Sequence, residues 1–196
     1  MITLSLVVVS VIFAGCGKNE VAKDANNTQI KETSSKINEL ELKNGERFFK
    51  SEVAPKSEAE KVILESFKVN ISDEYDKLSD LYIDAAGSVE IYKEICKEKF
   101  KDGLYTEQVT IHNLKKLTKE EYTNKSNGKK YYGNIDRLNK LNPKELEVIE
   151  VDYTIKLTDK ENKIAQWGNG DWVRYYVVVK ETEKENWKIF EEYGYM

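Results

Sequence analysis

The side chains of this sequence best suited to acid–base chemistry are carboxylates in strand-like segments near its C-terminus. Glu191 shares an alternating face with Trp187 and Ile189, and a carboxylate among aromatic side chains has a raised pKa, as a general base requires. Glu191 is therefore the candidate catalytic residue; the simpler interpretation is a carboxylate at the rim of a sheet, paired with a lysine. Asp152 alternates against apolar neighbours, so we expect it to face water or a neighbouring element.

Motifs of the common catalytic classes do not occur in the sequence. There is no glycine-rich phosphate loop, no Gly-x-Ser-x-Gly and no His-Glu-x-x-His. His112 is the one histidine, so we do not expect a histidine-based metal site or a catalytic triad. An acidic calcium loop is also missing. We therefore expect no metal and no cofactor, and we expect His112 on the polar side of its strand.

Aromatic side chains gather in the same C-terminal segments, and they have two interpretations. Most are expected to build a hydrophobic core. The alternative is that some of them line a concave site for a small apolar ligand or a peptide. The candidates for such a lining are Tyr153, Trp172, Tyr175 and Trp187.

Cys16 is a candidate for covalent modification because of the segment before it. An apolar run from Ile2 ends in Ala14-Gly15-Cys16, and the chain then turns abruptly polar. This pattern resembles a bacterial lipoprotein signal peptide. The resemblance implies lipid on the Cys16 thiol, removal of residues 1–15 and a protein anchored at the extracytoplasmic face of the cell membrane.

The segment departs from the lipoprotein pattern in two ways and leaves two alternatives. No basic residue precedes the apolar run, and Phe13 stands where the family usually has an aliphatic residue. One alternative is a short membrane anchor, although roughly 13 apolar residues are fewer than the roughly 20 that a helical span needs. The other is a cleaved secretory peptide in which Cys16 is incidental.

The second cysteine, Cys96, has no partner for an internal disulfide if Cys16 carries lipid. It shares a helical stripe with Val89, Tyr92 and Phe100. We therefore expect Cys96 to be a small buried hydrophobic residue instead of a reactive thiol.

Composition limits the class of partner. The net charge is −4 and charges of both signs are interspersed, which argues against a nucleic-acid-binding protein. Only three of the 31 basic residues are arginine, and Lys, Asn, Ile, Glu and Tyr are abundant. This usage is typical of AT-rich genomes, such as those of clostridia and related Gram-positive bacteria.

The chain divides into three parts. Residues 1–15 are the predicted signal peptide, residues 16–45 are polar and predicted to form a flexible tether, and residues 46–196 are predicted to form one domain. A coil of roughly 29 residues spans about 30 Å. Such a tether would hold the domain away from the membrane.

Helices are expected first within the domain. Ser57-Glu58-Ala59-Glu60 has the spacing of a capping box, and apolar residues then recur at helical spacing to about residue 71. A second helix is predicted after Ser72, and a third over about residues 89–100. A short helix is predicted near residues 135–140.

Strands are expected in the second half. Residues 109–112, 149–157, 172–181 and 187–193 alternate apolar and polar side chains or are β-rich. Helices followed by an antiparallel meander predict an α+β fold, with N-terminal helices packed on a curved antiparallel sheet.

The segments Val151–Ile155, Tyr175–Lys180 and Trp187–Ile189 resemble the C-terminal half of small clostridial lipoproteins with a nuclear-transport-factor-like (cystatin-like) cone domain. The resemblance covers roughly residues 55–196. It implies a strongly bent sheet that wraps around a helical layer and leaves a cavity.

Three functions are compatible with these observations. The first is a lipid-anchored protein of the cell envelope that binds a small ligand or a protein without catalysis. The second is an enzyme of the isomerase or hydratase type, which would need an inward carboxylate such as Glu191 and a pocket. The third is an immunity-type protein that blocks a partner through a convex charged face.

Overall fold

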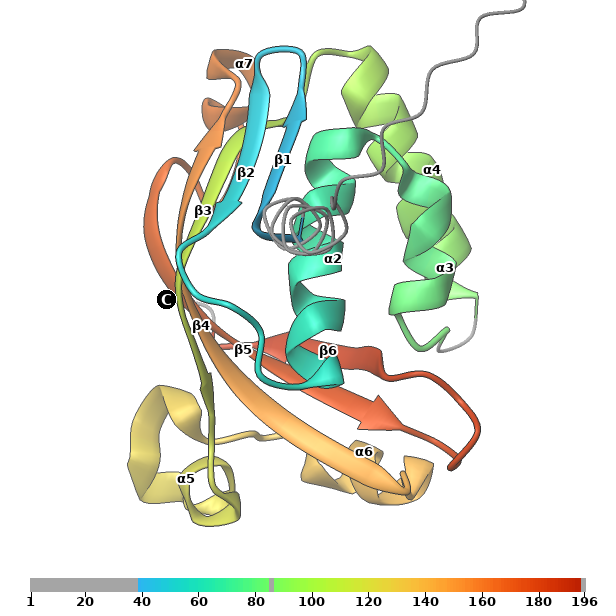
Figure 1. Cartoon of the computed structure of the whole chain (residues 1–196). Coiled ribbons are helices and arrows are strands. Elements are labelled where there is room, and N and C mark those ends of the chain that lie inside the picture. Colours follow the sequence, from blue (N-terminus) through green and yellow to red (C-terminus); the bar gives the residue numbers. More distant parts are fainter. Residues whose placement is uncertain (1–38, 85–86, 195–196) are drawn as a thin grey trace, which may run out of the picture.

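The structure is a computed structural model that describes residues 39–84 and 87–194. The predictions for residues 1–38, including the signal peptide, lipid on Cys16 and most of the tether, lie outside the described residues. The described part has a six-stranded sheet and helices on both of its faces (Figure 1). The predicted α+β class is confirmed.

The strands lie in the sheet in the order of the sequence. Every neighbouring pair is antiparallel except β2 and β3, which are parallel. They are β1 (Glu41–Asn44), β2 (Arg47–Ser51), β3 (Thr106–Lys116), β4 (Glu145–Leu157), β5 (Gly170–Lys180) and β6 (Lys188–Tyr193).

Two parts of the sequence-based prediction are corrected here. Strand β1 belongs to the sheet, so the segment predicted as tether up to residue 45 already contains part of the domain. The sheet is also not wholly antiparallel. The chain leaves β2, forms three α-helices and returns as β3, which lies beside β2 and runs in the same direction. A parallel neighbour needs such a long crossover connection.

The helices are α2 (Glu58–Ser72), the 3₁₀ turn η1 (Tyr75–Lys77), α3 (Leu78–Leu81), α4 (Ser88–Lys101), α5 (Lys119–Thr123), the 3₁₀ segment η2 (Lys125–Lys130), α6 (Ile135–Leu141) and α7 (Asp159–Asn162). In Figure 1 the long strands β3, β4 and β5 bend around α2, and α3 and α4 lie on the far side of α2 from the sheet.

Helix α2 forms where its sequence predicts. The Ser57 side chain accepts a hydrogen bond from the Glu60 backbone N–H at 3.2 Å, as an N-cap residue does. The Glu60 carboxylate accepts from the backbone N–H of Lys56 instead of Ser57, so half of the predicted capping box is present. The helix buries the apolar side chains that share one face: Ala59, Ile63, Phe67 and Ile71.

The concave face of the sheet is filled by α2. The Phe67 ring centroid lies 5.0 Å from that of Tyr153 and 6.0 Å from that of Tyr176, and both tyrosines are buried. A second core cluster on the convex face packs Tyr122 of α5, Tyr132 and residues of α6 against Tyr175, Val177 and Val179 of β5. Strand β5 therefore has apolar residues on both faces because both faces are covered.

Candidate functional site

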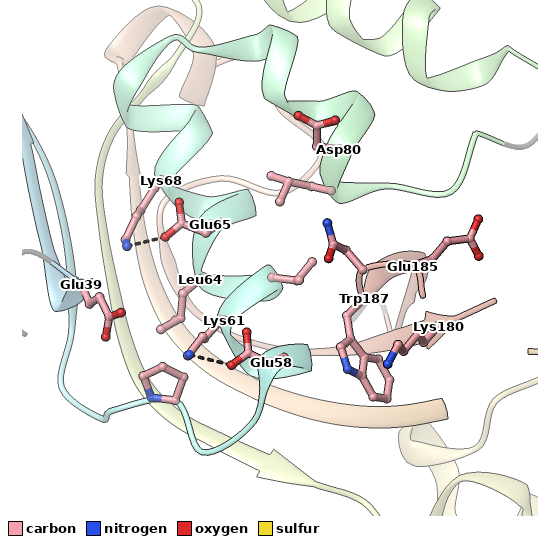
Figure 2. Close-up of a pocket in the computed structure, with 14 residues that line it drawn as sticks. Glu39, Glu58, Lys61, Leu64, Glu65, Lys68, Asp80, Lys180, Glu185 and Trp187 are labelled. Atoms are coloured by element: carbon pink, nitrogen blue, oxygen red, sulfur yellow. Dashed lines mark hydrogen bonds and ion pairs between the residues drawn. The ribbon is translucent and has the colours of Figure 1, made fainter. Parts of the chain in front are cut away.

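One groove runs along the solvent side of α2 and is shown in Figure 2. It encloses about 500 Å³ between Glu39, which precedes β1, helix α3 and the segment that joins β5 to β6. Its charged side chains pair with one another: Lys61 donates to Glu58 at 2.7 Å, and Lys68 donates to Glu65 at 2.6 Å. Charged groups that are already paired satisfy each other and leave little for a ligand.

A second groove, which we call the α4 groove, lies between the C-terminal half of α4 and the ends of the central strands. It encloses about 510 Å³. Its walls come from α4, the start of β3, the end of β4, Arg174 of β5 and the segment that follows α7. The apolar and aromatic lining residues include Tyr92, Ile95, Leu104, Tyr105, Ile155, Ile164 and Trp167.

The rim of the α4 groove exposes large apolar side chains. Tyr92, Ile95 and Ile164 are 46%, 47% and 66% exposed, and all three line the groove. Ile91, which is 64% exposed, lies one helical turn before Ile95 on α4. Exposed apolar side chains that cluster beside a groove are typical of a binding surface, whereas a single one is ordinary.

Helix α4 is turned so that this apolar stripe faces solvent. Lys93 is buried instead: its ammonium group donates to Glu90 at 3.0 Å and to Ser79 at 3.2 Å. The helix buries Val89 and partly buries Cys96 against η1 and α3. Tyr92, expected on the buried stripe, is therefore on the rim of the groove.

The lining of the groove also includes polar groups. Lys99 donates to Glu161 Oε1 at 2.5 Å, and the Glu161 side chain is only 10% exposed. Burial raises the pKa of the Cys96 thiol, which therefore stays protonated at neutral pH. Burial likewise raises the pKa of Tyr75. These surroundings support the prediction that Cys96 is unreactive, although Cys96 also lines the groove.

Arg174, which lines the groove, is paired with an acidic residue. Its Nη1 lies 3.5 Å from Oε2 of Glu192, and Oε1 of Glu192 accepts a 2.8 Å hydrogen bond from the Tyr82 hydroxyl. Strand β6 thus does place a carboxylate near aromatic side chains on the concave side, but that carboxylate is Glu192.

Glu191, the candidate catalytic residue, lies on the convex face. Its carboxylate accepts hydrogen bonds from Tyr132 at 2.5 Å, Asn134 at 2.6 Å and Arg137 at 3.3 Å. The reason is a β-bulge: Val178 pairs with Ile189, but Val177 pairs with Glu191. The extra residue, Phe190, reverses the alternation beyond Ile189, which the sequence pattern did not reveal.

The four aromatic residues proposed to line a site do not share one. Tyr153 is buried under α2, and Tyr175 is buried on the opposite face with its ring 5.1 Å from Tyr193. Trp187 lines the first groove, which runs along α2 (Figure 2). Trp172 packs against the core and meets Trp167, a wall of the α4 groove, edge-on at 5.7 Å.

His112 takes part in a hydrogen-bonded row across the outer face of the sheet. Its Nδ1 is 2.9 Å from Glu52 and its Nε2 is 2.7 Å from the Thr154 hydroxyl. This spacing resembles a hydroxyl–histidine–acid triad, but the Thr154 hydroxyl donates its single proton to Asp171 at 2.5 Å. The hydroxyl therefore has no proton left to give His112.

The hydrogen bond from His112 lowers the pKa of Glu52. Asp152, the other carboxylate considered from the sequence, is half-buried in β4 and lies opposite Val173 in the register. Neither residue lines the α4 groove.

Within residues 39–84 and 87–194, no helix is both long enough and apolar enough to cross a membrane. Over the same residues, no group of three or more histidine, cysteine or acidic side chains is arranged to hold a metal ion. A scan against protein-family models matches none over this chain, and a search of curated proteins finds no similar sequence.

Proposed function

We propose that this chain is a lipid-anchored binding protein of the bacterial cell envelope. Lipid on Cys16 attaches it to the extracytoplasmic face of the membrane, and the domain binds a small apolar molecule in the α4 groove. The observation that carries the binding proposal is the cluster of exposed apolar side chains at one groove: Tyr92, Ile95 and Ile164.

The groove has the size and lining of a small-molecule site. Ligand pockets typically have volumes of roughly 300–1,000 Å³, apolar walls and a few polar groups, and about 510 Å³ falls inside that range. Its two cationic groups, Arg174 and Lys99, each pair with a carboxylate. A ligand can therefore bury apolar surface in the groove without leaving an unpaired charge buried.

The enzyme alternative has less support than binding. It was motivated by an inward carboxylate at Glu191, and Glu191 is bound by Tyr132 and Asn134 on the other face. The space beneath α2 is occupied by Phe67 and its aromatic neighbours. The cone family, with its cavity, is supported only by the resemblance of the sequence segments named above.

Anchoring is tested by metabolic labelling with a clickable fatty acid, followed by membrane fractionation. We expect the full chain to carry the label and to sediment with membranes, and Cys16→Ala to lose the label. Cys96→Ala is the matched control, because it removes the other cysteine and must keep the label. A Cys16→Ala variant that is still processed and membrane-bound contradicts lipid anchoring.

Binding is tested by methyl NMR of the full chain in lipid nanodiscs, with benzyl methyl ether as the probe. Isoleucine methyl groups report directly, since Ile95, Ile155 and Ile164 line the groove whereas Ile63 and Ile111 are buried in the core. We expect saturable shifts at the groove methyls alone. The absence of any saturable shift at Ile95, Ile155 and Ile164 contradicts the proposed site.

A matched pair of variants distinguishes binding in the α4 groove from non-specific binding to exposed apolar residues. Ile164→Asp places a charge on the rim, and Val173→Asp places one on another exposed apolar residue, 44% exposed on β5 and outside the groove. We expect Ile164→Asp to weaken probe binding at Ile95 and Ile155 at least severalfold and Val173→Asp to leave it unchanged. Equal effects would show that the α4 groove is not the site.

A further inference from the structure

Glu161 has a buried oxygen that the protein leaves without a hydrogen bond. Among the side chains of residues 39–84 and 87–194, Oε2 of Glu161 is the buried polar atom with no partner. The Glu161 side chain is nine-tenths buried, and the residue lines the α4 groove. Buried polar atoms are nearly always paired, so an unpaired carboxylate oxygen requires an explanation.

The position of Glu161 is well determined by its surroundings. Its backbone N–H donates to the Thr158 hydroxyl at 3.2 Å, which caps α7, and the Thr158 hydroxyl donates to the carbonyl of Gly103 at 2.9 Å. Lys99 approaches Oε1 from α4. The carboxylate is thus held between α4 and α7, and rotation of the residue out to solvent would break the ion pair.

We infer that the α4 groove selects a small apolar molecule that carries a neutral hydrogen-bond donor, a hydroxyl or an amide N–H, for Oε2 of Glu161. The inference rests on the proposed function, because it names the class of ligand for the same groove. Tyr92, Ile95, Ile164 and Trp167 contact the apolar body of the molecule, and Glu161 accepts from its donor.

Charge favours a neutral donor over a cation. The single negative charge of Glu161 is already balanced by Lys99 at 2.5 Å. The other cation of the groove, Arg174, is balanced by Glu192. An ammonium ligand would add an unbalanced charge beside Lys99, whereas a hydroxyl or amide satisfies the oxygen without one.

The inference is tested with benzyl alcohol and benzyl methyl ether, in which a methyl group replaces the hydroxyl hydrogen and so removes the donor. Both are titrated into the full chain in nanodiscs, with empty nanodiscs as the partition control and the groove methyls as the readout. We expect benzyl alcohol to bind about tenfold more tightly than the ether, the effect of one hydrogen bond to a charged acceptor. Equal affinities overturn the inference.

Variants identify the acceptor. Glu161→Leu removes it and is expected to erase the difference between alcohol and ether while the ether still binds. Lys99→Met leaves Glu161 without its cation, and we expect benzylammonium to gain about tenfold relative to wild type. If Glu161→Leu does not fold, the comparison of the two probes on the wild-type protein still decides whether the groove selects a donor, and Lys99→Met still tests Glu161 as the acceptor.

The outcomes separate the two proposals. If neither probe shifts the methyls of Ile95, Ile155 and Ile164, the groove is not the binding site and the proposed function fails. If both probes bind with equal affinity, the groove binds apolar molecules but Glu161 does not select a donor. A preference for the alcohol that persists in Glu161→Leu also overturns the assignment of Glu161.

Discussion

The hydroxyl of Tyr82 donates a 2.8 Å hydrogen bond to Glu192 and so joins the end of α3 to strand β6. The backbone reinforces this link, since the Ile83 N–H donates to the Ile189 carbonyl at 2.9 Å. Burial, and then the nearby Glu192 carboxylate, raise the pKa of Tyr82 well above its ordinary value, so the hydroxyl stays a donor at neutral pH. Glu192 in turn pairs with Arg174 at the α4 groove.

Tyr82→Phe is expected to lower the free energy of unfolding by about 1.5–3 kcal/mol, because it removes a donor from a charged, mostly buried acceptor. Urea unfolding followed by circular dichroism measures the change. Tyr193→Phe is the control, since its hydroxyl donates to the neutral backbone carbonyl of Lys130; there we expect a loss of about 0.5–1.5 kcal/mol. A larger loss in Tyr193→Phe than in Tyr82→Phe would contradict this ranking.

Arg47→Lys is expected to lower the free energy of unfolding by about 2–4 kcal/mol, although the charge is kept. The buried Arg47 guanidinium bonds Asp73 at 2.5 Å, bonds the carbonyl of Ile71 and lies 4.9 Å from the Phe100 ring centroid. A lysine ammonium does not reproduce this planar set of contacts. The loss is measured by urea unfolding.

Arg137→Lys tests whether any arginine replacement would have that effect. Arg137 pairs with Glu191 at 3.3 Å, but its side chain is 54% exposed. We expect a change within about 0.5 kcal/mol for such a surface pair. Equal losses in the two variants would show that burial of the Arg47 pair is not what matters.

Glu121 should make stability depend on acid pH. It closes a capping box by accepting from the Thr118 backbone N–H at 2.8 Å, and Lys115 donates to it at 3.1 Å. The Thr118 N–H first and Lys115 second lower the pKa of Glu121 from 4.5 to about 2. Because the pKa is lower in the folded state, the stabilisation is complete above pH 4.5 and is lost as the pH falls towards about 2.

Glu121→Gln should therefore unfold at a lower temperature than the wild type at neutral pH, and the difference should shrink between about pH 4.5 and pH 2. Thermal unfolding across this range measures it. Glu120→Gln changes the adjacent carboxylate, which is outside the capping box, and is the control at neutral pH, where we expect a smaller loss than in Glu121→Gln. A pH-independent difference for Glu121→Gln would contradict the assignment.

Phe67→Ala is expected to lower the free energy of unfolding by about 3–5 kcal/mol, because it leaves a cavity in the core. Phe67 projects from α2 and packs against the rings of Tyr153 and Tyr176. Ile91→Ala, at the exposed end of the α4 stripe, should change the same quantity by no more than about 0.5 kcal/mol. A substantial loss in Ile91→Ala would mean that the stripe serves folding more than binding.

Local periodicity in the sequence predicted the elements that repeat regularly. Val109 and Ile111 of β3 are buried as their alternation indicates, and α2 begins and ends near the residues that its cap and apolar spacing indicate. Strands β1 and β2 went unpredicted. They are short, four and five residues, so alternation within them carries little signal.

The face of a side chain in β6 could not be read from the sequence. Alternation placed Glu191 beside Ile189, but the bulge at Phe190 puts Glu192 there instead. A bulge arises from the way a strand pairs with its neighbour, and its effect is to exchange the two faces for every later residue.

The sequence by itself determined the α+β class, the apolar faces of its regular elements and the pattern that ends at Cys16. Only the tertiary structure decided that Tyr92, Ile164 and Glu161 lie around one groove. These residues come from α4 and from the segment around α7, which are far apart in the chain. Local propensity acts over a few neighbouring residues, whereas the groove depends on how the sheet and its crossover helices bring distant segments together.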